Sequence, residues 1–273
     1  MKAKGQRGFL VPVIRLGYGP GIEDFSGHPP SMNTRHIVSA YDEELAALGD
    51  RIAAMGGHAE RMVEEAVAAL INDDVALARK VIADDAVLDE GERWVDDYAV
   101  RLIARRQPMA DDLRGVLGAI RISSDLERVG DLGKNIAKRV VAIAEAGQPV
   151  QLFRGIEALA TLALMQLKQV LDIYASRSVD AIAFMRDRDG EIDAMYTSLF
   201  RELLTYMMED PRNISPCTHL LFCAKNIERI GDHATNIAET VYHMVTGEQL
   251  PLERPKEDKS HRVTIHALAG GAG

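Results

Sequence analysis

Two stretches of the sequence carry carboxylates and an amide at regular four-residue intervals. The two series are Glu127, Asp131 and Asn135, and Glu228, Asp232 and Asn236. Side chains four residues apart on an α-helix lie nearly above one another, so each series would form a line along one helix face. The apolar residues of both stretches fall on the opposite side. The spacing therefore predicts that the two acidic lines face away from the main core, toward solvent or another element.

Two further acidic pairs have the same spacing and precede the two series. They are Asp85 with Asp89, and Asp189 with Asp193. Two carboxylates at this spacing repel each other and destabilise an isolated helix by about 0.2–0.5 kcal/mol, so their recurrence needs a reason. A hard cation supplies one, because Mg²⁺, Ca²⁺, Mn²⁺ and iron accept oxygen ligands from converging carboxylates. The predicted metal ligands are Glu127, Asp131, Glu228, Asp232, Asp85, Asp89, Asp189 and Asp193.

The alternative interpretation is a solvated acidic face on which Arg128 and Arg229 form salt bridges. The Glu-x-x-His spacing of di-iron helical bundles is absent, which favours a structural or regulatory ion. His233 follows Asp232 directly, and we interpret it as an ordinary surface or interface histidine rather than a ligand. The sequence has no phosphate-binding loop, dinucleotide-binding glycine motif or zinc-protease motif. We therefore predict no catalytic residue and no enzymatic activity.

The elements that must position these residues are six long helices in two sets of three. Apolar spacing and helix-ending residues predict them at about 42–71, 74–106, 110–145, 153–176, 179–208 and 215–246. The run Leu-Glu-Arg-Val-Gly-Asp at 126–131 recurs as Ile-Glu-Arg-Ile-Gly-Asp at 227–232, and an Asn-Ile-Ala run follows each at the same offset of 101 residues. An internal repeat of this kind predicts an all-α fold, a tandem duplication of a three-helix bundle with two pseudo-symmetric halves.

The repeat also sets the expected domain boundaries. We expect a disordered extension over 1–35, bundles over 36–147 and 148–248, and a disordered tail over 249–273. Met32 is a second plausible start, which leaves open whether residues 1–31 are translated.

The composition limits the classes of partner and compartment. The 273 residues are 47% hydrophobic but only 5% aromatic, which suits packed helices better than sheets. A net charge of -9 disfavours nucleic acid and anionic lipid as partners. Cys217 and Cys223 lack metal-binding spacing, so we expect both to be buried thiols in a cytoplasmic protein. No apolar run approaches the roughly 20 residues of a membrane span, so no direct membrane insertion is expected.

The paired motifs at 126–131 and 227–233, each followed by Asn-Ile-Ala, resemble the signatures of the PhoU family. The likeness extends from about residue 33 to 248 and includes the segments 107–114 and 242–247. The resemblance implies a fold of two similar three-helix bundles. It also implies an accessory protein of the high-affinity phosphate transporter that dampens the phosphate-starvation response. Such a protein would contact the ATP-binding subunit of the transporter and the membrane sensor histidine kinase.

The resemblance also bears on metal binding, because some family members bind metals through Glu/Asp-x-x-x-Asp motifs. The matching positions are Glu127 with Asp131 and Glu228 with Asp232, and the two Asp pairs on the preceding helices share the spacing. The expected cofactor is a hard metal ion such as Fe, Mn, Mg or Zn. We therefore expect a homodimeric, cytoplasmic negative regulator that acts as an adaptor. A carboxylate-metal protein, either a store or an enzyme, and a structural scaffold are the alternatives.

Overall fold

The computed structural model describes residues 32–146, 154–179 and 182–250. These ranges contain six α-helices and one short 3-10 helix, and no strand. The elements are α1 (Met32–Asn72), α2 (Val75–Arg106), α3 (Asp111–Ala146), α4 (Arg154–Ser176), α5 (Ile182–Glu209), η1 (Pro211–Asn213) and α6 (Ile214–Thr246). The predicted all-α fold of two three-helix halves is confirmed. Residues 1–31 and 251–273, which hold most of the two predicted tails, lie outside the described residues.

Local chemistry sets the ends of several helices. Asp74 caps α2, because its side chain accepts a hydrogen bond of 2.9 Å from the backbone N–H of Leu77. Gln107 ends the same helix in the left-handed conformation, directly before a proline. Gly247 ends α6 with a φ of 76°, and its N–H bonds to the carbonyl of His243. These ends lie within a few residues of the predicted ones.

The start of α1 differs from the prediction. The helix begins at Met32 rather than near residue 42, so it includes residues 32–35, which we had placed in the extension. It also continues through Gly56, where a side chain would overlap Leu171 of α4. This glycine therefore allows two helices to approach closely instead of breaking one.

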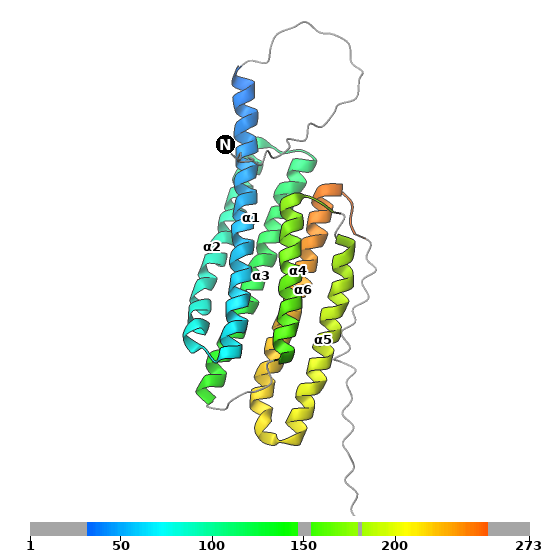
Figure 1. Ribbon diagram of the computed structural model, residues 1–273. Coiled ribbons are helices and arrows are strands. Elements are labelled where there is room, and N and C mark those ends of the chain that lie inside the picture. Colours follow the sequence, from blue (N-terminus) through cyan, green and yellow to red (C-terminus); the bar gives the residue numbers. More distant parts are fainter. Residues whose placement is uncertain (1–31, 147–153, 180–181, 251–273) are drawn as a thin grey trace, which may run out of the picture. The chain divides into compact units, whose positions relative to one another are not determined.

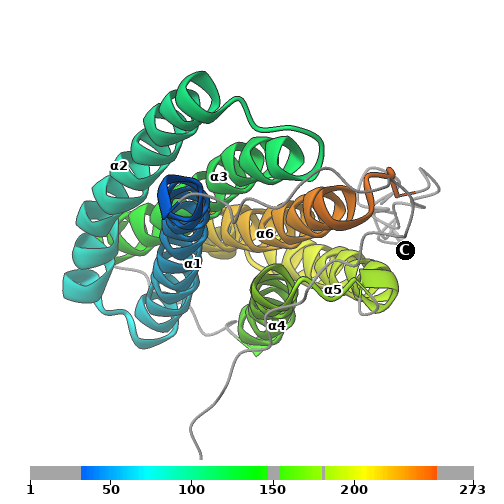
Figure 2. The same cartoon turned by 90° about the horizontal axis from the view of Figure 1, so that it is seen from above.

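The described residues from Ala40 onward form one compact unit, which contains both three-helix halves apart from residues 32–39 of α1. Within this unit α3 and α6 lie side by side and antiparallel, with α2 beside α3 and α4 and α5 beside α6 (Figures 1 and 2). Asp125 of α3 pairs with His233 of α6. Further along the same contact, Arg139 of α3 stacks on Phe222 of α6. The two halves thus meet along their third helices and also where α1 approaches α4 at Gly56.

The core consists mainly of Leu, Ile, Val and Ala side chains, with a few Met, Tyr and Cys, contributed by all six α-helices. The described part of α1 packs against its own half, since Arg106 of α2 bonds to Glu44 at 2.7 Å. Cys217 and Cys223 are both buried free thiols, as predicted. Among the described helices none combines the length and the apolar character that a bilayer crossing requires.

The glycines of the repeated motif set the distance between helices. A methyl group on Gly130 would overlap Leu88 of α2, and one on Gly231 would lie 3.0 Å from Ile192 of α5. Leu88 and Ile192 each follow an acidic residue of the candidate site by three positions. The close approach that the glycines permit therefore also brings the acidic pairs of α2 and α5 against α3 and α6.

We predict that Gly130→Ala lowers the free energy of unfolding by about 1–2 kcal/mol. The added methyl group crowds the fully buried Leu88, and this cost exceeds the gain of about 1 kcal/mol in helix propensity. Gly57→Ala is the matched control, because nothing lies within 4 Å of a methyl group there, and it should stabilise the protein. Urea denaturation of both variants measures the difference. Equal stabilisation by both substitutions would contradict the packing role of Gly130.

Candidate functional site

The first acidic cluster lies between α2 and α3. Its members are Asp85, Asp89, Glu127 and Asp131. Asp85 is only 5% exposed. Burial raises the pKa of Glu127, and the charges of Asp131, Glu92 and Asp89 raise it further. The four carboxylates are therefore close enough to repel one another.

Lys134 is the internal cation of the first cluster. Its ammonium donates to Asp85 and also to Asp131, at 2.8 Å in the second case. Burial alone would lower the pKa of Lys134, but the hydrogen bonds to Asp131 and Asp85 outweigh burial and raise it. The lysine thus stays protonated and balances part of the negative charge. Arg128 reaches Glu127 only at 3.6 Å, from a side chain that is 60% exposed.

The second acidic cluster lies between α5 and α6. Its members are Asp189, Asp193, Glu228 and Asp232. Burial raises the pKa of Glu228, and although Lys225 lowers it, Asp232 and Asp193 raise it. Lys225 donates to Glu228 Oε1 at 2.8 Å. This half therefore also places one ammonium among its carboxylates.

A short polar chain extends the second cluster toward α4. Thr235 donates to Asp189 at 3.1 Å, and Gln166 of α4 donates to Thr235 at 2.9 Å. Gln166 is completely buried. The second cluster is thus connected to all three helices of its half.

The two lysines do not occupy equivalent positions in the repeat. The residue 101 positions after Lys134 is Thr235, and the residue 101 positions before Lys225 is Ser124. Each half therefore keeps its four carboxylates but receives its ammonium from the opposite end of the motif. We did not predict either lysine from the sequence. The i,i+3 spacings of Asp131 with Lys134 and of Lys225 with Glu228 are the signals that indicate them.

The structure brings the eight predicted carboxylates together in two groups of four. Each acidic line of the third helices faces another element, α2 or α5, rather than solvent. The interpretation as a solvated acidic face is wrong for the four buried carboxylates, which are Asp85, Asp189, Asp193 and Glu228. Asn135 does not join the first cluster; it is exposed and lines a pocket on the side facing α6.

His233 lies at the boundary between the two halves, outside the two acidic clusters. Its Nδ1 lies 2.8 Å from Asp125 of α3, and both side chains are 17% exposed. It is therefore an interface histidine, one of the two roles expected for it.

The carboxylate oxygens of both clusters suit a hard cation chemically, but the two clusters differ in how well they could accept one. Within the described ranges no three His, Cys, Asp or Glu side chains are arranged to hold a metal ion. In the first cluster Lys134 already occupies oxygens of Asp85 and Asp131. In the second, buried Glu228 Oε2 has no hydrogen-bond partner among the described residues. The second cluster is therefore the better fit.

Comparison with known proteins finds one family in both halves. The model of the PhoU domain matches residues 52–140 and 156–241. The chain is 66% identical over 227 residues to the phosphate-specific transport system accessory protein PhoU homolog of Rhizobium meliloti, covering 83% of this chain and 96% of that protein. It is 49% identical to the homolog of the same description from Caulobacter vibrioides, covering 82% of this chain and 98% of that protein.

Solved structures show the same similarity. The crystal structure of PhoU from Pseudomonas aeruginosa superimposes with a TM-score of 0.73 at 36% identity, over 76% of this chain and 100% of that one. The phosphate transport system regulatory protein PhoU from Streptococcus pneumoniae gives a TM-score of 0.71 at 28% identity, over 78% of this chain. The second match shows that the arrangement of helices is similar even at 28% sequence identity.

We predict that Glu228→Gln gains stability relative to the unchanged protein as the pH rises from about 4 to about 7. The pKa of Glu228 is raised on folding, so the folded state binds this proton more tightly than the unfolded state. The stability that the protonated carboxyl contributes is present below the unfolded pKa and is lost as the pH rises toward the folded pKa. Glutamine avoids this loss. Urea denaturation at several pH values measures it.

Glu239→Gln serves as the control, because Glu239 is an exposed residue of the same helix. It measures the effect of removing a charge from the surface of α6. If Glu228→Gln instead loses stability relative to the unchanged protein as the pH rises, then the ionised carboxylate is the favoured form in the folded state and the prediction is wrong.

Proposed function

This chain belongs to the PhoU family, and we propose that it is an adaptor that represses the phosphate-starvation response. In this role it links the ATP-binding subunit of a phosphate transporter to a phosphate-sensing histidine kinase and performs no bond chemistry itself. The supporting observation is the identity of 66% with a phosphate-specific transport system accessory protein homolog, over 96% of that protein. The cytoplasmic location and the homodimeric state remain predictions.

An adaptor needs an exposed surface that a partner can recognise. The acidic clusters are poorly suited to this, since half of their carboxylates are buried, the others are only partly exposed, and each cluster contains its own lysine. The outer face of α2 is better suited. Asp96 and Asp97 are exposed there, beside Val100, which is 64% exposed, and the exposed Arg93 and Arg101 lie one turn to either side of Asp97. Apolar and acidic side chains together suit a partner surface that is basic around an apolar centre.

Deletion of the gene tests the regulatory role. We expect phosphate-scavenging genes to be expressed in phosphate-rich medium in the deletion strain and repressed again when the gene is restored. A reporter for such a gene gives the measurement. Unchanged expression after deletion would rule out negative regulation.

Charge reversal on α2 tests the partner contact. The double substitution Asp96→Lys with Asp97→Lys should reduce co-purification of the ATP-binding subunit or of the kinase by about tenfold or more, through like-charge repulsion. Glu191→Lys with Glu202→Lys on α5 is the matched control, with the same charge change at exposed positions. Equal effects of the two double substitutions would exclude α2 as the specific contact.

A second candidate function is metal binding, and Glu228 supports it. A buried carboxylate oxygen without a donor is costly, and a hard cation would satisfy it. If Fe, Mn, Mg or Zn binds in the second cluster, adding that metal to the purified protein should raise its Tm. Glu228→Gln should abolish the rise, while Asp131→Asn in the first cluster should preserve it. Purified protein with no bound metal and no change in Tm would exclude this function.

A further inference from the structure

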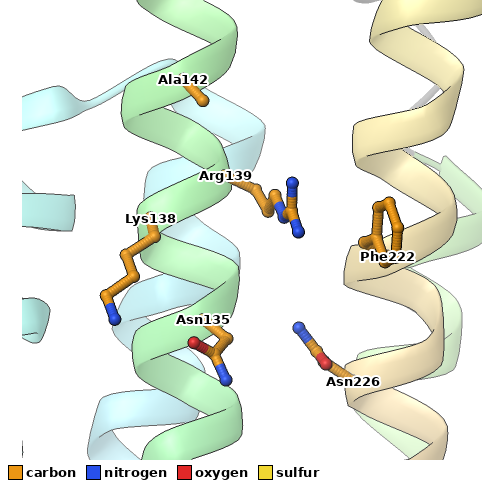
Figure 3. A pocket seen from close by; sticks show the side chains of 6 residues that line it. All are labelled: Asn135, Lys138, Arg139, Ala142, Phe222 and Asn226. Atoms are coloured by element: carbon orange, nitrogen blue, oxygen red, sulfur yellow. The ribbon is translucent and has the colours of Figure 1, made fainter.

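A pocket of about 350 Å³ opens between α3 and α6. We call it the α3–α6 pocket. It is lined by Asn135, Lys138, Arg139, Ala142, Phe222 and Asn226. Arg139 reaches from α3 toward the Phe222 ring, and the amides of Asn135 and Asn226 lie in the same gap (Figure 3). The pocket is separate from the acidic clusters, which face α2 and α5.

The polar lining of this pocket consists of two cations and two amides, with no carboxylate. Neither Lys138 nor Arg139 forms an ion pair in the part of the chain that the structure describes. The two positive charges of this pocket contrast with the net charge of -9 of the whole chain. Such a pocket attracts anions.

Arg139 is held in a defined position. Its guanidinium lies 4.3 Å from the centre of the Phe222 ring, which stacks against it. Stacking on a ring leaves the N–H groups at the guanidinium edge available for an anion. The positive charge also extends to α6: burial lowers the pKa of His219, and the charge of Arg139 lowers it further.

The repeat provides an internal comparison for the pocket. Because the halves are offset by 101 residues, Asn226 corresponds to Asp125, and Lys138 corresponds to Glu239. The equivalent crossing of α3 and α6 therefore carries two acids, and Asp125 is paired there with His233. At the α3–α6 pocket an amide and a lysine stand in their places. The two crossings share a backbone arrangement, but the equivalent one, with Asp125, Glu239 and Arg121, is acidic on balance whereas the pocket is basic.

We propose that the α3–α6 pocket binds the phosphate group of a small molecule. A phosphate group with a charge near -2 suits Arg139, which points into the gap, together with Lys138, whose flexible side chain lines the pocket but points away from Phe222 (Figure 3). The fork of Arg139 suits two phosphate oxygens, and the amides of Asn135 and Asn226 can donate to the others. The volume exceeds that of a phosphate ion and leaves room for an organic part against Phe222, which is 49% exposed.

Isothermal titration calorimetry of the full chain, in a buffer without phosphate or sulfate, tests this site. The probes are inorganic phosphate, adenosine monophosphate and adenosine. We expect adenosine monophosphate to bind and adenosine not to bind. Binding of inorganic phosphate as well would show that the anion suffices, and its absence would show that the organic part contributes; both results support the site. No binding of either phosphate-bearing probe at millimolar concentration would overturn it.

Three variants locate the binding. Arg139→Met with Lys138→Met removes both cations, and Asn226→Asp restores the acid of the equivalent crossing. Each should weaken binding of adenosine monophosphate by about tenfold or more, the effect of losing a charge-assisted hydrogen bond. Arg121→Met is the control, because Arg121 occupies the position equivalent to Phe222.

The Tm of each variant shows whether it is folded, and Asn226→Asp keeps the test valid if loss of the Arg139 stacking destabilises the double variant. Equal weakening by Arg121→Met would indicate general charge attraction and overturn the assignment. Loss of a partner protein from the double variant, without any binding of the probes, would assign the pocket to an acidic protein segment instead. The adaptor role does not depend on this pocket. A negative titration would therefore reject only the pocket, and an unchanged deletion phenotype would reject only the adaptor role.

Discussion

Four carboxylates can share the interface of two packed helices only if a cation stands among them. Repulsion and desolvation would otherwise protonate some of the acids or separate the helices. In both halves a lysine satisfies this requirement, Lys134 in one and Lys225 in the other. The close contact at Gly130 and Gly231 makes the requirement strict, because it leaves little room for the helices to move apart. The motif therefore combines a packing role and an electrostatic role within six residues.

The fold followed from the sequence almost completely. The offset of 101 residues between the motifs predicted the duplication, and Pro108, Asp210 and Gly247 indicated where helices end. The start of α1 was less accessible. The prediction began this helix near residue 42, whereas it begins at Met32. Gly56 within it contributes a close helix contact with Leu171 that compensates for its low helix propensity. Spacing along one helix carries no information about such a contact with another.

The sequence predicted which carboxylates form the acidic site, but not which helices and lysines surround them. Spacing placed Glu127 and Asp131 on one face, yet it could not show that the face packs against α2. The lysines were missed for a related reason, since their positions differ between the halves and the search for repeated residues passes over them. The α3–α6 pocket shows the same limit, because Asn226 becomes informative only when compared with Asp125 across the antiparallel contact.

The two placements of the lysine also constrain how the copies diverged. Passing from one placement of the ammonium to the other requires the gain of one lysine and the loss of the other. A form with no lysine would bring four negative charges together without compensation, whereas a form with two would still carry net negative charge. The safe route gains the new lysine before losing the old one. The interface therefore constrains the order of mutation: in α3, Ser124→Lys would give the form with two lysines, and Lys134→Thr the form with none.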